Sequence, residues 1–361
     1  MQRKSTILIL GASYGSLLGA KLLLAGHDVH FVCLPAEADL INREGLRVRL
    51  PVRGAPGQVE IDTRKASGRA SASGAQGVDP ARYDLVALAM QEPQYAAPGV
   101  RDLVGTIAAA RVPCMSIMNM PPLAYLRRIP ALDTAKLRSC YTDPSVWDAF
   151  DPALVTLCSP DPQAFRPPDD KANVLQVSLP TNFKAARFVS DAQTGMLRAL
   201  EADIDALRFP TAHGEIELPV KLKVHDSVFV PLAKWSMLLT GNYRCVQPGG
   251  MRSIRDAVHG DPAASRRVYE WVGAVCRALG ARDADLVPFD KYAKAAEGLT
   301  KPSSAARALA AGAPNIERVD KLVQAAGAQC GMRDDVVNAV VAEVDRWLAR
   351  NRERQAASQP A

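Results

Sequence analysis

A short apolar run, a glycine-bearing turn and an alanine- and leucine-rich segment follow one another at the start of this chain. The run Ile7 to Leu10 is apolar throughout, which is typical of a strand buried on both faces of a parallel sheet. Ser16 to Ala25 has helical spacing and stops before Gly26. Val29 to Leu34 is apolar again, so the segment predicts a strand–helix–strand unit. This unit is the start of a Rossmann-type domain.

The turn between the first strand and the helix is made of Gly11, Ala12, Ser13, Tyr14 and Gly15. Small residues there allow the backbone to turn tightly and to approach a pyrophosphate, while the following helix directs its N–H groups at the phosphates. We therefore predict that these five residues bind a dinucleotide. Ser13 stands where the second glycine of G-x-G-x-x-G would be, and the loop is one residue short. A tight turn without a ligand is the alternative.

The rest of the chain divides into a strand-rich part and a helix-rich part. The patterns predict strands at 85–90, 114–118 and 174–177 and a helix at 191–207. They also predict an exposed connection at 63–80 and an irregular excursion at 143–168. From Val228 to Arg350 the pattern is mostly helical. The expected fold is α/β, with an N-terminal Rossmann-type parallel-sheet domain over residues 1–210 and an all-helical C-terminal domain over 211–361.

Composition narrows the function classes. Hydrophobic residues make up 48% of the chain and charged residues 23%, with no apolar stretch long enough to span a membrane. The net charge of +6 comes with only 6% aromatic residues, which argues against a nucleic-acid-binding surface. The seven cysteines are scattered and the five histidines show no ligand spacing, so we expect neither disulfides nor a metal site. Together these features predict a cytoplasmic protein without a membrane or nucleic-acid partner.

Several motifs along nearly the whole chain resemble those of one enzyme family. They are the stretch Gly15 to Ala20, the stretch Ala25 to Val29, Tyr83 to Val86, Ile117 to Asn119, Lys234, Asn242 and Ser303 within Lys301 to Ser304. In this combination the chain resembles the ketopantoate reductases (2-dehydropantoate 2-reductases). The resemblance implies hydride transfer from a nicotinamide cofactor to a 2-oxo acid, as in pantothenate biosynthesis. It further implies NADP(H) rather than NAD(H) and a small carbonyl compound as substrate.

The resemblance also assigns roles to individual residues. It implies that Lys234 is catalytic and that Asn119, Asn242 and Ser303 bind the substrate. Asn119 would also contact the cofactor, together with two glutamines of the preceding loop, Gln91 and Gln94. For each polar position a plain structural role is the alternative: a surface lysine at 234, and helix or turn caps at 119, 242 and 303.

Lysine chemistry suits the implied reaction. As a hydride reaches a carbonyl carbon, negative charge develops on the oxygen, and an ammonium can stabilise it and donate the proton. Lys234 is flanked by apolar residues, so we expect burial to lower its pKa. In a regular α-helix Lys234 and Asn242 would lie about 12 Å apart along the axis.

The chain departs from the family pattern at several positions. Leu238 replaces an asparagine one turn after the lysine. Asn315 falls where an acidic residue is expected, with Glu317 close by. The basic residues expected near a 2′-phosphate fall at Leu34 and Gln91. These departures favour a larger or more apolar carbonyl substrate than ketopantoate.

Two other functions fit the same sequence. An opine or imine dehydrogenase would join an amine to a keto acid on a similar scaffold. A non-catalytic dinucleotide-binding protein that senses redox state or binds a partner would explain the shortened loop and the missing phosphate-binding cations. A homodimer would be compatible with an apolar helix face in the second domain.

Overall fold

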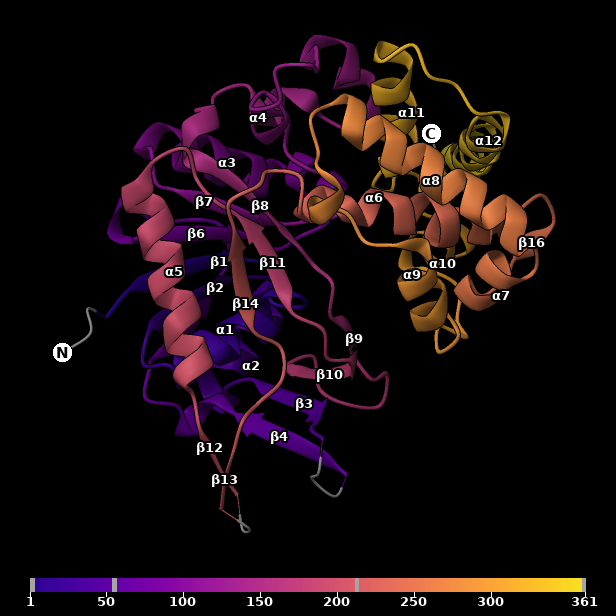
Figure 1. Ribbon diagram of the computed structural model, residues 1–361. Coiled ribbons are helices and arrows are strands. Elements are labelled where there is room, and N and C mark those ends of the chain that lie inside the picture. The colour runs from indigo at the N-terminus through magenta and orange to yellow at the C-terminus, as the bar shows by residue number, and fades with distance from the viewer. Residues whose placement is uncertain (1–3, 54–56, 212–213, 359–361) are drawn as a thin grey trace. The chain divides into compact units, whose positions relative to one another are not determined.

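The computed structural model describes residues 4–53, 57–211 and 214–358. The chain forms two compact units (Figure 1). The first contains Met1–Met90, Gln94–Tyr125 and Ser145–Pro231, and the second contains Gln91–Pro93, Leu126–Pro144 and Leu232–Ala361. The predicted combination of a Rossmann-type sheet with a helical region is confirmed.

The first unit is built on an eight-stranded sheet with the order β14-β11-β8-β7-β6-β1-β2-β5. Its strands are β1 (Thr6–Leu10), β2 (Asp28–Val32), β5 (Ala70–Ser73), β6 (Leu85–Leu88), β7 (Cys114–Ile117), β8 (Val155–Ser159), β11 (Phe183–Ala186) and β14 (Leu222–His225). The six strands from β5 to β8 in this order are parallel, and β11 runs antiparallel to β8. The carboxyl ends of β1, β6, β7 and β8 therefore share one edge of the sheet.

Helices connect these strands and cover the sheet. They are α1 (Gly15–Leu24), α2 (Pro35–Glu44), α3 (Pro98–Ala110), α4 (Leu123–Leu126) and α5 (Asp191–Ala206). Helix α1 packs closely on the sheet because a Cβ at Gly19 would collide with the ring of Phe31 on β2. Short 3₁₀ turns lie at 63–65, 80–82, 92–96, 134–140, 144–147, 152–154, 231–233 and 283–285.

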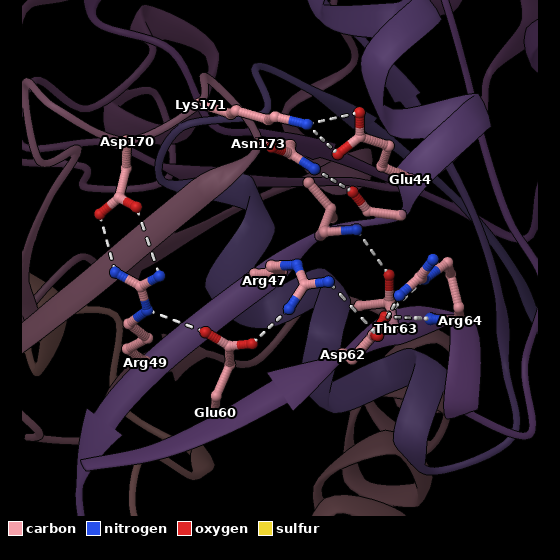
Figure 2. A network of polar contacts seen from close by, with 12 residues as sticks. Glu44, Arg47, Arg49, Glu60, Asp62, Thr63, Arg64, Asp170, Lys171 and Asn173 are labelled. Atoms are coloured by element: carbon pink, nitrogen blue, oxygen red, sulfur yellow. Dashed lines mark hydrogen bonds and ion pairs between the residues drawn. The ribbon is translucent and has the colours of Figure 1, made fainter. Parts of the chain in front are cut away.

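A second sheet in this unit has the order β4-β3-β10-β9. Its strands are β3 (Arg47–Pro51), β4 (Gln58–Asp62), β9 (Gln163–Phe165) and β10 (Val174–Leu179), and a hairpin of β12 (Phe209–Thr211) and β13 (Gly214–Ile216) lies apart from it. Figure 2 shows a network of charged side chains on this sheet, in which Arg49 donates to Glu60 at 2.8 Å and to Asp170 at 2.7 Å. Arg47 donates to Glu60 at 2.6 Å. We call this network the charged face of the second sheet.

Two segments differ from the sequence-based expectation. The segment 63–80 is not only an exposed connection, because it contains the edge strand β5, whose Ala72 exchanges two hydrogen bonds with the Asn42 side chain. The segment 143–168 contains β9 and the fully buried β8. In β8 the polar Thr156 is satisfied by donating to the Ala186 carbonyl at 2.7 Å, so its burial costs little.

The first unit also extends beyond the boundary expected after residue 210. Strand β14 pairs with β11 in parallel register, with Phe183 opposite Leu222, and thereby becomes the last strand of the eight-stranded sheet. Residues up to Pro231 consequently belong to the first unit.

The second unit is mostly helical. It contains α6 (Lys234–Met237), α7 (Ile254–His259), α8 (Pro262–Ala278), α9 (Phe289–Ala296), α10 (Ser304–Ala310), α11 (Val319–Gln329) and α12 (Asp335–Ser358). A π-helical segment (Leu238–Asn242) and a 3₁₀ turn (Tyr243–Cys245) continue α6, and a small hairpin of β15 (Val246–Gln247) and β16 (Gly250–Met251) follows. Across the described parts of the chain, no helix has the length and apolar character needed to cross a membrane.

Candidate functional site

The glycine loop lies at the carboxyl end of β1, where the strand order changes direction. β1 has β2 on one side and β6 on the other, and such switch points are where open α/β sheets bind ligands. Gly11 has a φ of +99°, and a Cβ there would lie 2.8 Å from the Ala89 carbonyl oxygen and 2.6 Å from Met90 Cγ. Only glycine fits this position. The backbone therefore passes tightly between the ends of β1 and β6.

The remaining loop residues prepare the start of α1. Ala12 is buried and Ser13 is exposed, while the Tyr14 hydroxyl donates to the Pro160 carbonyl at 3.1 Å. The helix begins at Gly15, and the Ser16 hydroxyl bonds the Ala12 carbonyl. The first turn of a helix presents N–H groups without intrahelical partners and the positive end of the dipole. The loop that contains Ser13 therefore lies next to these free N–H groups at the start of α1.

Other predicted residues of the first unit lie near the same edge of the sheet or in its loops. Asn119 follows β7 and is half-buried. Because β7 and β1 are parallel members of the sheet, Asn119 and Gly11 share the carboxyl edge. Gln94 is exposed within the 3₁₀ turn after β6. Gln91 is exposed as well, but it belongs to the second compact unit.

The carboxyl end of β2 carries a cation that the sequence did not indicate. Leu34 is 74% exposed there, in place of a basic residue. Glu37, in the first turn of α2, forms an ion pair with Arg166, which follows β9. Arg166 comes from a distant segment, so no local motif could have found it.

The helix that carries Lys234 and Asn242 is interrupted by the π segment. The Tyr292 hydroxyl donates to the Met237 carbonyl at 3.1 Å, and a Cβ at Gly241 would collide with that hydroxyl. A side chain inserted into the helical ladder is a known cause of such a bulge, and π-bulges occur frequently at functional sites. Tyr292 and Gly241 together account for the local change.

The bulge alters which residues share a face. Over eight residues an α-helix turns about 80° beyond two full turns, which would separate Lys234 from Asn242 around the axis. A π segment holds more residues in each turn and so rotates less per residue. It brings Asn242 back toward the face of Lys234. Both side chains are half-buried, whereas Leu238 between them is buried.

Asn242 and Ser303 lie together. The Ser303 hydroxyl donates to the Asn242 carbonyl at 2.8 Å and accepts from the Ala306 N–H at 3.1 Å, which makes it the N-cap of α10. Ser303 is 3% exposed. Ser303 therefore caps α10 and also contacts Asn242, another predicted site residue.

Two buried glutamates form an acidic pair in the second unit. Asn315 is exposed and bonds Arg352 at 3.0 Å, whereas Glu317 is buried and accepts from the Glu92 N–H at 3.4 Å. The Glu92 carboxylate accepts two bonds from Thr142, each 3.0 Å long. Burial, together with the charge of Glu317, raises the pKa of Glu92 to about 7. A buried carboxyl whose pKa is raised in this way is a candidate functional group.

Sequence reasoning named Glu317 but missed Glu92. The sequence offered only a weak signal, since Glu92 lies two residues after the apolar segment 85–90. Among the residues that the structure describes, no group of three His, Cys, Asp or Glu side chains could hold a metal ion.

Solved structures place this architecture among known folds. A PanE/ApbA-family ketopantoate reductase from Ralstonia eutropha JMP134 superimposes with a TM-score of 0.63 at 17% identity, covering 96% of this chain and 99% of that one. The 2-dehydropantoate 2-reductase from Methylococcus capsulatus gives 0.64 at 16%, covering 96% and 97%. This chain has the ketopantoate reductase fold.

The same fold includes an enzyme with another substrate. A D-mandelate dehydrogenase, solved with NADH and anilino(oxo)acetate, superimposes with a TM-score of 0.60 at 13% identity, covering 96% of this chain and 99% of that one. No family model matches this chain, and no curated protein matches it by sequence. The ketopantoate reductase fold is thus present without a sequence match that would carry a substrate.

Proposed function

We propose that this protein is an NAD(P)-dependent oxidoreductase that reduces a 2-oxo acid or a related carbonyl compound to the hydroxy compound. The observation that carries the proposal is the loop at Gly11, where a glycine-only backbone and the start of α1 meet at the switch point of the sheet. The neighbouring structures named for ketopantoate and mandelate point to the same reaction class.

Lys234 is the proposed general acid. When bound, the nicotinamide cofactor supplies a hydride to the carbonyl carbon. The ammonium of Lys234 donates a proton to the carbonyl oxygen as charge develops there. Asn242 orients the substrate by hydrogen bonding, and Ser303 fixes the loop that borders Asn242. The proposed role of Asn119, in the first unit, is to contact the cofactor.

Glu317 takes the acidic role that the family resemblance leads one to expect at Asn315. Asn315 is exposed and engaged with Arg352, so it cannot serve a buried substrate. Glu317 is buried beside Glu92, whose pKa of about 7 allows the pair to hold a proton near neutral pH.

The cofactor is NADP(H) in this proposal. Arg166 supplies the positive charge that Leu34 lacks at the carboxyl end of β2, where the ribose of a bound dinucleotide lies. Glu37 opposes a 2′-phosphate, so the preference is moderate. We expect Arg166→Ala to weaken NADPH more than NADH in a titration that follows reduced-nicotinamide fluorescence. An equal loss for both cofactors would contradict a role for Arg166 at the 2′-phosphate.

A screen of 2-oxo acids tests the reaction. Because Leu238 is buried where the family has a polar residue, the preferred substrate is larger or more apolar than ketopantoate. Ketopantoate belongs in the panel as the reference. An amine added to each reaction distinguishes the opine or imine dehydrogenase alternative, whose rate would depend on it.

Lys234→Ala is the decisive variant. We expect turnover to fall by roughly 10²- to 10⁴-fold, while cofactor binding is retained. Lys294→Ala is the matched control, since Lys294 is an exposed lysine on α9 of the same unit. Unchanged turnover in Lys234→Ala would overturn the mechanism. Failure of both NADPH and NADH to bind would favour the non-catalytic alternative.

The partner is a second copy of this chain. A dimeric ketopantoate reductase from Staphylococcus aureus has the same fold, with a TM-score of 0.56 at 11% identity. Size-exclusion chromatography with light scattering tests this part of the proposal.

A further inference from the structure

Two arginines of the second unit, Arg244 and Arg252, form no ion pair within the described part of the chain. Arg244, in the 3₁₀ turn Tyr243–Cys245, is only 7% exposed. It donates to the Ser265 hydroxyl at 2.6 Å and to the Thr240 carbonyl at 3.4 Å. Within the described ranges no carboxylate forms an ion pair with it. Both of its hydrogen-bond partners are neutral, and the more distant charge of Asp261 offsets the charge of Arg244 only in part.

Arg252 lies next to Arg244. Its Nε donates to the Arg244 carbonyl at 2.9 Å, and its backbone N–H donates to the Cys245 carbonyl at 3.0 Å. Arg252 is half-buried and likewise has no carboxylate partner in the parts of the chain described. Burial lowers the pKa of Arg244, and the charge of Arg252 lowers it further. Two guanidinium groups are thus held close together against their repulsion.

This arginine pair borders the candidate substrate residues. Backbone hydrogen bonds join Ile254 to Lys301 and Arg255 to Leu299, which places the segment after Arg252 beside the loop that leads to Ser303. Ser303 in turn bonds the Asn242 carbonyl. The Cys245 thiol lies beside both Ser303 and Arg252, which each oppose the rise that burial causes in its pKa. Asn242, Ser303 and Arg252 therefore form one cluster.

The hydroxyl of Ser303 is already engaged within this cluster. It donates its proton to the Asn242 carbonyl and accepts from the Ala306 N–H. A serine has only one proton to donate, so Ser303 cannot also donate to a carboxylate without breaking the first bond. A carboxylate in this cluster needs another donor. A guanidinium can bind one through two parallel hydrogen bonds.

We propose that Arg252, with Arg244 behind it, binds a carboxylate group of the substrate. The identification of that carboxylate as the substrate's rests on the proposed function, whereas anion binding itself does not. An incoming carboxylate compensates the two unmatched charges. Ser303 positions the bordering loop. Esters and amides of the substrate lose this interaction.

Oxalate is the probe for the test, and neutral oxamide is its uncharged counterpart. Each is titrated against the full-length protein by thermal shift and calorimetry at constant ionic strength, with and without NADPH. We expect oxalate to bind and oxamide not to bind. Arg252→Gln should weaken oxalate roughly 10- to 100-fold, and Arg252→Lys should weaken it less because the charge remains.

Arg255→Gln is the matched control. Arg255 is an exposed arginine three residues away, lies 3.5 Å from Asp256, and carries the same charge. Its loss should leave oxalate affinity unchanged. Melting of each variant without ligand separates a folding defect from a binding defect. The Arg252→Lys variant keeps the test valid if Arg252→Gln is unstable.

Two results would overturn the inference. One is an equal loss of oxalate affinity in Arg252→Gln and Arg255→Gln, which would show that the effect comes from the loss of a positive charge and not from a contact made by Arg252. The other is no oxalate binding to the native protein at millimolar concentration. If oxalate binds through Arg252 but no 2-oxo acid is turned over, the proposed function is contradicted and the anion site is still supported.

Discussion

The arginines on the charged face of the second sheet form ion pairs with carboxylates, whereas those of the arginine pair in the second unit do not in the described part of the chain. On the sheet, Arg49 meets carboxylates on both sides, at 2.8 Å and 2.7 Å (Figure 2). In the helical unit, the side-chain hydrogen bonds that Arg244 and Arg252 form among the described residues all go to neutral groups. The sheet arginines pair with carboxylates of the same chain, which indicates a structural role. The unmatched pair points to an anion from outside.

A buried lysine avoids an unpaired charge in a third way, by losing its proton. Lys21, on α1, is 1% exposed. Burial, assisted by the charge of Lys221 and opposed by Glu217, lowers its pKa to about 7. Lysine can therefore escape an unmatched charge by losing its proton. Arginine cannot, because its pKa is too high. The arginine pair therefore keeps a charge that Lys21 can lose.

The largest expected effect concerns a matched pair that is buried. Asp320, on α11, is fully buried and accepts from Arg318 at 3.0 Å and 2.9 Å. Asp320→Asn would leave the Arg318 charge poorly compensated in the interior. We expect a loss of about 3–5 kcal/mol in the stability of the helical unit, measured by chemical denaturation.

Asp345→Asn is the control for that variant. Asp345 also pairs with Arg318 but is 51% exposed, so we expect its loss to cost about 1 kcal/mol or less. If both substitutions lower the free energy of unfolding equally, burial would not determine how much an ion pair contributes to stability, and the comparison would fail.

The second prediction concerns Lys21 and pH. Its folded-state pKa of about 7 lies below the ordinary 10.5, so protonation destabilises the fold. The penalty is complete below about pH 7 and declines as pH rises from 7 toward 10.5. Between pH 6 and pH 8 the wild-type protein should therefore gain roughly 1 kcal/mol from this group.

Lys21→Met removes the titrating group and should abolish that part of the pH dependence. The variant should also be more stable than wild type at pH 6. Lys65→Met, at an exposed lysine, serves as the control. Thermal unfolding across pH 6 to 9 makes the comparison. An unchanged pH profile in Lys21→Met would mean that the amine stays protonated and has found a partner.

The sequence predicted the fold where local pattern and tertiary role agree. The apolar run at 7–10 and the helix from 16 both appear within one residue of their expected starts, as β1 and α1. It missed β8 because the segment 143–168 is rich in proline, aspartate and aromatic residues, a composition typical of irregular structure. Within β8, Thr156 donates to the distant Ala186 carbonyl and Ser159 bonds the nearby Asp161. A buried polar strand residue looks like a loop residue until its partner is known.

The candidate site likewise contains residues that sequence motifs indicate and residues that only the folded structure reveals. Lys234, Asn242 and Ser303 came from motifs, and the structure brings Asn242 and Ser303 together. The ion pair of Arg166 and the hydrogen bonds of Glu92 join segments more than 40 residues apart, so no spacing rule could reveal these contacts. The π segment arises from the meeting of Gly241 with Tyr292 of another helix. Such contacts exist only after folding.

The smallest expected effect concerns the charged face itself. The Arg49 side chain is 30% exposed, so water and salt already screen its pairs with Glu60 and Asp170. Arg49→Ala should cost about 0.2–1 kcal/mol at low salt, and the difference from wild type should shrink in 1 M NaCl. Thermal unfolding at both salt concentrations measures it, with Arg53→Ala, an exposed arginine after β3, as the control. A loss of several kcal/mol would make an exposed matched charge as valuable as the buried Arg318–Asp320 pair. The lack of ion pairs to Arg244 and Arg252 among the described residues would then reflect a protein that places stability in its surface network, and the case for an external anion would weaken.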